Sequence, residues 1–157
     1  MKQEDKDLLI KDLSSRLPYG VILACAEIVG EELREMTKEG LINCDYDLDE
    51  VKPFLYPLSS MTLDQMEEYA RLSYEKRRHM KETYDLVDIV HKTDHVLIRV
   101  KNKISGEEFI YGSIGYNSPM DYPDFGIDWL LKNHFDWRGL IPLGLAKNAT
   151  GLGIYGK

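Results

Sequence analysis

The run NHFDWRGLI, residues 133–141, places a histidine, an aspartate and an arginine at alternate positions, with an aromatic residue in each gap. The side chains of His134, Asp136 and Arg138 can exchange protons or bind anions, so the spacing suggests a catalytic or binding constellation. The run itself contains no serine or cysteine nucleophile. Because a catalytic triad is defined by geometry and not by spacing, catalysis would depend on a nucleophile that the fold brings in.

The same run also fits a structural corner between two helical segments. Asn133 tolerates the left-handed backbone conformation that closes helices, and Asp136 is a suitable N-cap for a following turn. Pro142 would interrupt any longer helix that started from that cap. The pattern favours the corner, and a binding surface is the alternative. The candidate residues of that surface are His134, Asp136, Trp137 and Arg138.

A second motif, HKTDH at residues 91–95, could bind a metal ion. On a helix, two histidines four positions apart can reach the same ion. These residues, however, precede a predicted strand in a turn-like setting, where the two rings need not converge. The sequence therefore leaves open a metal site formed by His91, Asp94 and His95, or a solvated loop. It predicts no cofactor, because there is no glycine-rich phosphate loop and no zinc-ribbon spacing.

The segment EKRRHMK, residues 75–81, is the most basic part of the chain and could contact phosphates. Acidic residues precede it on the same predicted helix, which instead indicates an acidic-to-basic helix aligned with its own dipole. The whole chain carries 27 acidic and 20 basic residues, a formal net charge of −7. This charge disfavours non-specific binding to nucleic acids or anionic membranes.

The periodicity of apolar residues predicts an α+β fold, a small antiparallel sheet (meander plus hairpin) packed with three to four helices. In the hairpin, Val96, Ile98 and Val100 are expected to face the core. Thr62 and Gln65 form a predicted capping box at the start of the second helix. We expect helices at 4–17, 62–83 and 124–134, strands at 19–29, 41–46, 95–102 and 107–116, and irregular structure or one short helical turn at 49–61.

The 157 residues are long enough for one domain with an apolar core, so we predict a single domain over residues 1–157. From about residue 147 the chain is glycine-rich and is expected to be irregular, anchored by Ile154 and Tyr155. Deleting residues 150–157 should then cost little stability. The polar N-terminus predicts no signal peptide, and no apolar run approaches the length of a membrane span, so a cytoplasmic location is expected.

Three stretches carry a resemblance to a known family. They are LLIKDLSSRLPYGV (8–21), DEVKPFLYPLSSMT (49–62) and HFDWRGLIPLGLA (134–146), about a quarter of the chain. They resemble members of a family of uncharacterised small proteins encoded by gut bacteria and their phages or mobile elements. The resemblance implies a host-directed or regulatory role, but it transfers no catalytic residue.

These observations favour a non-enzymatic binding or regulatory protein that acts on a host protein or a small nucleotide. Two alternatives remain. The first is a small hydrolase, metal-dependent or not, that uses His91, His95 or His134. The second is a nucleic-acid-binding regulator that uses the basic segment 75–81. The oligomeric state does not follow from the sequence.

Overall fold

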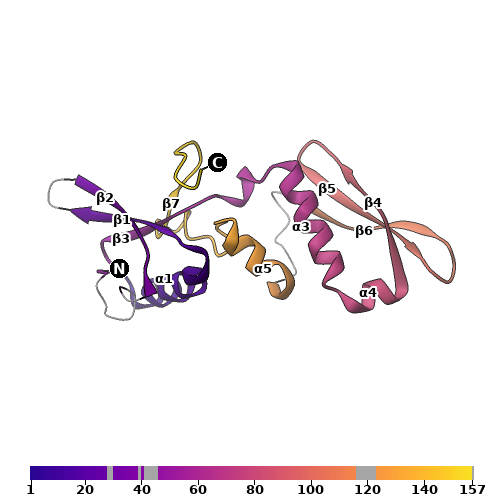
Figure 1. The fold of residues 1–157 in the computed structure, drawn as a ribbon, viewed down its shortest axis with the longest axis horizontal. Coiled ribbons are helices and arrows are strands. Elements are labelled where there is room, and N and C mark those ends of the chain that lie inside the picture. Colours follow the sequence, from indigo (N-terminus) through magenta and orange to yellow (C-terminus); the bar gives the residue numbers. More distant parts are fainter. Residues whose placement is uncertain (28–29, 39, 41–45, 116–122, 157) are drawn as a thin grey trace. The chain divides into compact units, whose positions relative to one another are not determined.

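The computed structural model describes residues 1–27, 30–38, 40, 46–115 and 123–156. As predicted, the fold is α+β, and its helices and strands are labelled in Figure 1. The chain divides into two compact units, residues 1–57 with 130–157, and residues 58–129. One domain over residues 1–157 stays a prediction. Among the described residues, no helix combines the length and the apolar character needed to cross a bilayer.

Unit 1 consists of a helix and a mixed sheet. In the sheet, β1 pairs antiparallel with both β2 and β3, and β3 pairs parallel with β7, which gives the order β2-β1-β3-β7. The elements are α1 (Gln3–Arg16), a short 3-10 turn (Leu17–Tyr19), β1 (Ile22–Glu27), β2 (Gly30–Glu35), β3 (Val51–Leu55) and β7 (Lys147–Asn148).

The first helix forms where the leucine spacing predicts it. Leu9 and Leu13 lie one turn apart and are fully buried, and the helix gives way to the 3-10 turn that contains Pro18. They pack into one apolar cluster with residues of β1, β3 and the segment after α5. The buried members are Leu9, Leu13, Val21, Leu23, Cys25, Met36, Val51, Leu55, Leu140, Leu145 and Ala146.

The prediction of irregular structure or one short helical turn at residues 49–61 is wrong over Val51–Leu55, which form β3, whereas Leu58–Ser60 do form one short 3-10 turn. Proline cannot donate to a sheet ladder, which is why Pro53 argued against a strand. The strand tolerates Pro53 because β7, which lies on the side of β3 opposite to β1, pairs only with Phe54 and Leu55. On the β7 side, Pro53 therefore faces no paired strand among the described residues. The strand predicted at 41–46 lies outside the described residues except for Tyr46.

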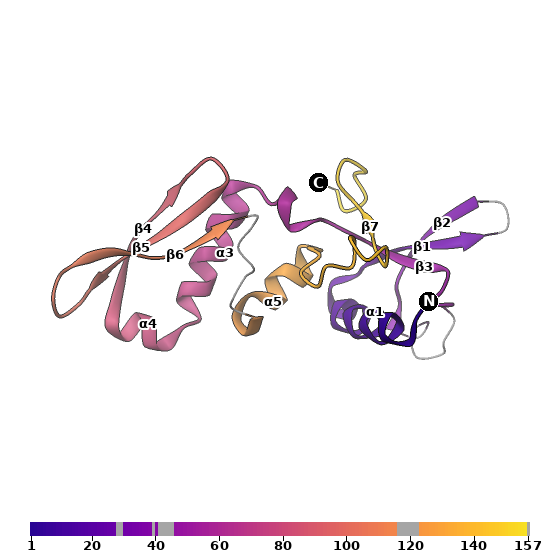
Figure 2. The same cartoon turned by 180° about the vertical axis from the view of Figure 1, so that it is seen from behind.

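Unit 2 packs helices on one face of a three-stranded antiparallel sheet of order β4-β5-β6 (Figure 2). The capping box at Thr62 and Gln65 is present, as predicted. The elements are a 3-10 turn (Leu58–Ser60), α3 (Leu63–Glu75), α4 (Arg78–Thr83), β4 (Tyr84–His91), β5 (His95–Asn102), β6 (Glu108–Gly115) and α5 (Pro123–Lys132), whose last three residues belong to unit 1.

The helix predicted over 62–83 is interrupted, because Arg77 adopts an extended backbone conformation between α3 and α4. The predicted hairpin is confirmed as β5 and β6. Val96, Ile98 and Val100 are 0%, 6% and 0% exposed, which confirms that they face the core. A third strand, β4, was not predicted and pairs with β5 from Val96 to Asn102.

The C-terminal tail contributes to the sheet of unit 1 through Tyr155. In the β1–β3 ladder the last pair is Leu23 with Pro53, so the next pair would join Ile22 to Phe54. The Tyr155 hydroxyl lies between these two groups: it accepts from the Ile22 N–H at 3.0 Å and donates to the Phe54 carbonyl at 2.8 Å. These bonds indicate that the tail stabilises unit 1, contrary to our expectation that residues 150–157 can be removed at little cost.

Tyr155→Phe should lower the free energy of unfolding by about 1–3 kcal/mol at neutral pH, because two backbone groups lose their partner. Burial, the largest cause, raises the pKa of Tyr155 to about 12. Since an unfolded tyrosine titrates near pH 10, the stabilisation is complete below about pH 10 and is lost as the pH rises towards 12. Urea unfolding from pH 8 to 11.5 should show that the free energy of unfolding falls less steeply with pH in Tyr155→Phe than in the wild type. Equal slopes of this free energy against pH would contradict this account.

Candidate ligand-binding site

The corner residues of unit 1 do come together, and they form a packed turn rather than a helix. His134 has a φ of +58°, so it is the left-handed residue that we predicted at Asn133. This correction has a local cause: His134 donates its N–H to Leu131, while its carbonyl accepts from Tyr56. The imidazole is 8% exposed and stacks on the Tyr155 ring, with centroids 3.7 Å apart.

Asp136 caps a loop, not a helix. Its carboxylate accepts from the N–H groups of Leu140 and Ile141 at 2.8 and 2.7 Å, four and five positions ahead. A helix N-cap would bond two or three positions ahead, so the predicted role as a cap holds but its helical context does not. Because both carboxylate oxygens bind backbone amides, the main role of Asp136 is to hold the chain in this turn.

The corner is joined to α1 by charges buried in unit 1. Asp12 and Arg16 are both fully buried, and Arg16 Nε donates to Asp12 at 2.6 Å. Arg16 Nη2 also donates to the Phe135 carbonyl at 2.8 Å, and Arg138 Nε lies 3.3 Å from Asp12. The Arg138 guanidinium covers the Trp137 ring at 4.0 Å. These contacts fix α1 against the corner, so the corner acts as a scaffold.

The two histidines of HKTDH do not converge on one metal position. His91 pairs with Val96 in the β4–β5 ladder, so it shares the helix-facing side with that buried residue, and its ring contacts Glu67 of α3 at 2.6 Å. His95 is adjacent to Val96 and therefore points to the opposite face, where it contacts Asp94 at 2.7 Å. Among the described residues, no three potential ligands lie close enough to hold a metal.

The basic segment 75–81 is exposed except at Arg77 and Met80. Arg77 is only 7% exposed and points into unit 2. Arg78 pairs with Glu82 at 3.0 Å, one turn further along α4. The segment therefore presents one cation fewer to solvent than the sequence suggested, because Arg77 is buried.

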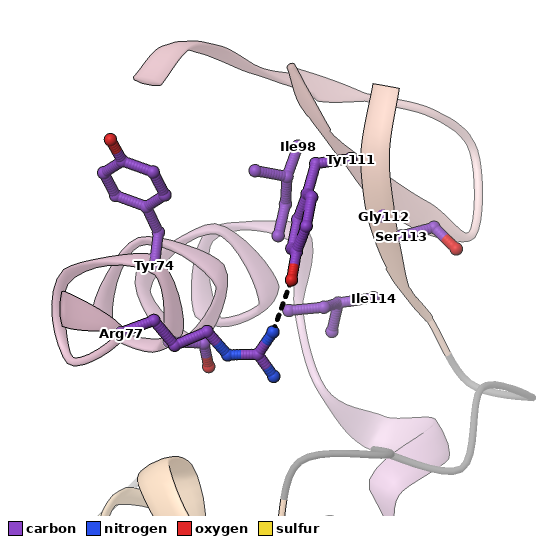
Figure 3. A pocket seen from close by; sticks show the side chains of 8 residues that line it. Tyr74, Arg77, Ile98, Tyr111, Gly112, Ser113 and Ile114 are labelled. Atoms are coloured by element: carbon purple, nitrogen blue, oxygen red, sulfur yellow. Dashed lines mark hydrogen bonds between the residues drawn. The ribbon is translucent and has the colours of Figure 1, made fainter. Parts of the chain in front are cut away.

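A pocket in unit 2 is a candidate site formed by described residues. It is a small cavity that is partly open to solvent. The walls are mainly apolar, with one buried cation (Figure 3). The lining residues are Ser73, Tyr74, Arg77, Ile98, Tyr111, Gly112, Ser113 and Ile114.

An irregularity in β6 creates this pocket. Ile98 pairs with Gly112 and the next residue, Arg99, pairs with Ile110, so Tyr111 is an extra residue in the ladder. Such a bulge breaks the alternation of faces. As a result, Tyr111 and Gly112 both lie on the helix-facing side. A Cβ built on Gly112 would meet no atom within 4 Å, which shows that the missing side chain leaves open space.

The interruption between α3 and α4 supplies the polar wall of the pocket. Arg77 Nη1 donates to the Tyr111 hydroxyl at 2.7 Å, and Figure 3 shows the two side chains directed towards each other. The Tyr74 hydroxyl donates to the Tyr84 carbonyl at 2.8 Å, which ties the last turn of α3 to β4. Burial raises the pKa of Tyr69, which lies near Arg77, against the opposing effects of Ser73 and of the arginine charge.

Sequence reasoning singled out segments other than this pocket. It included Arg77 in an exposed basic patch and gave no role to Tyr111 or Gly112. One signal was present, since a glycine inside a strand pattern often marks a bulge or a close approach of a ligand. The burial of Arg77 had no comparable signal, because it depends on the interruption between the two helices.

Comparisons with known proteins add no name to this site. No protein-family model, curated protein or solved structure matched the chain. The resemblance carried by residues 8–21, 49–62 and 134–146 therefore stays a hypothesis.

Asp136→Ala should lower the free energy of unfolding by about 2–4 kcal/mol, because it leaves the amides of Leu140 and Ile141 without their acceptor. Asp136→Asn keeps the shape and one acceptor oxygen, so about half of that loss is expected. Urea denaturation measures both values. If Asp136→Ala is as stable as the wild type, the corner is not held by this carboxylate.

Proposed function

We propose that this protein is a non-enzymatic binding protein that holds a small molecule in the pocket between α3 and β6. The observation that carries the proposal is the cavity opened by the bulge at Tyr111 and Gly112, with the buried Arg77 guanidinium in its wall. Mainly apolar pockets with a few fixed polar groups are the usual form of small-molecule sites.

The chemistry of the lining favours binding over catalysis. The described residues around the pocket include no histidine, cysteine, aspartate or glutamate. General acid–base catalysis near neutral pH usually depends on such groups, and arginine stays protonated there. Ser113 supplies a hydroxyl, but its side chain points away from Arg77 and Tyr111 (Figure 3).

A regulatory role fits this proposal. The resemblance to small proteins of gut bacteria, phages and mobile elements favours a protein that senses or sequesters a small metabolite of the host cell. In that role the ligand would be a signal and not a substrate. This step rests on the resemblance alone.

Gly112→Val provides a direct test, because it fills the pocket without requiring a left-handed backbone conformation. The wild type, equilibrated with a bacterial metabolite extract and desalted, should retain a compound that mass spectrometry detects. Gly112→Val should retain at least tenfold less of it, while its melting temperature stays at or above that of the wild type.

Glu108→Val is the matched control, since it places the same side chain in the same strand outside the pocket. It should retain as much compound as the wild type. If nothing is retained by the wild type, or if Gly112→Val retains as much, the proposed function is wrong.

A further inference from the structure

We infer that the socket of Tyr155 is an interaction site for a tyrosine side chain, and that a second copy of this chain fills it with its own tail. The socket is formed by Ile22, Phe54, Tyr56 and His134 of unit 1. In a single chain the tail occupies its own socket, and in an exchanged pair each tail crosses to the other copy. Two features carry the inference, the fit of Tyr155 and the exposed segment that precedes it. The site is independent of the pocket in unit 2.

The socket binds tyrosine through both its hydroxyl and its ring. The Tyr155 hydroxyl accepts from the Ile22 N–H at 3.0 Å and donates to the Phe54 carbonyl at 2.8 Å. Its ring lies parallel to the His134 imidazole, with centroids 3.7 Å apart, and its centroid is 5.9 Å from that of Tyr56. A phenylalanine would leave both backbone groups without this partner, and a site built to bind a hydroxyl rejects an analogue that lacks it. The socket therefore selects tyrosine over phenylalanine.

The segment before Tyr155 can serve as a hinge. Ala149 is fully buried and donates its N–H to the Leu55 carbonyl at 2.9 Å, so the chain is fixed up to that residue. Residues 150–153 are exposed, and their two glycines turn the chain at positive φ, within the loop that follows β7 in Figure 1. Because glycine adopts extended conformations equally well, this segment can straighten without strain and without exposing a buried side chain.

A second copy is the partner that fits, since its tail presents the same side chain on the same length of chain. When straightened, residues 150–155 span about 20 Å, which carries Tyr155 out of its own socket to that of an adjacent copy. The contacts made there are the same as those within one chain, so the exchange costs no contact. Within one chain, a short tail has an effective concentration of millimolar order at its socket. Exchange therefore becomes appreciable near that protein concentration.

The peptide GLGIYGK, which corresponds to residues 151–157, tests the socket in the full-length variant Tyr155→Ala. Amide NMR should show that the peptide shifts the signals of Ile22 and His134. The same peptide with Tyr155→Phe should bind at least tenfold more weakly. The wild type, whose own tail fills the socket, should also bind GLGIYGK at least tenfold more weakly than the variant. Equal affinity for the two peptides, or unshifted signals of Ile22 and His134, would overturn the site.

Refolding of the wild type tests the exchange and needs no change at Tyr155. After refolding from urea at about 1 mM, size-exclusion chromatography with light scattering should show a dimer, and its fraction should fall at least tenfold after refolding at about 10 µM. GLGIYGK in about tenfold molar excess should suppress the dimer, because it fills the sockets, whereas the phenylalanine peptide should not.

Leu152→Ala is the matched control, because Leu152 lies in the same tail and is 56% exposed. This variant should dimerise as the wild type does. A wild type that stays monomeric at about 1 mM, or a dimer that persists in excess GLGIYGK, would overturn the exchange between copies.

Discussion

Buried backbone N–H and C=O groups must have hydrogen-bond partners, and in unit 1 side chains supply those that the sheet and helix do not. The Tyr155 hydroxyl takes the place of a rung between β1 and β3. Asp136 binds two amides of the turn that follows it, and Arg16 binds the Phe135 carbonyl. Tyr155 and Arg16 are distant in sequence from the backbone groups that they satisfy, so the tail, the corner and α1 stabilise one another. The charged residues of the corner therefore have a structural role, because they bind backbone groups.

In unit 2 the regular backbone pairing between β5 and β6 is interrupted at Tyr111, and this interruption forms the pocket. The bulge at Tyr111 removes one residue of β6 from the regular ladder and places two neighbours on the same face. Because the second neighbour is Gly112, no side chain refills the space. The interrupted helix directs Arg77 to the same place, where it meets Tyr111. A cation, a hydroxyl and a cavity thus meet through three local departures from regular structure.

The sequence predicted those parts of the fold that depend on local periodicity. Alternation identified the hairpin and its buried Val96, and the capping box located the start of α3. It did not predict β3, because a strand can contain Pro53 only if the neighbouring strand β7 ends before that residue. The sequence does not show where β7 ends. It also could not locate the pocket. A bulge is a mismatch between two strands, and neither strand alone contains the information that the registers differ.

The central claim is that the pocket between α3 and β6 binds a small molecule, and retention of a compound from a bacterial metabolite extract tests it most directly. We predict that the desalted wild type retains a compound and that Gly112→Val, which fills the pocket, retains at least tenfold less. No retained compound in the wild type, or equal retention in Gly112→Val, would contradict the account.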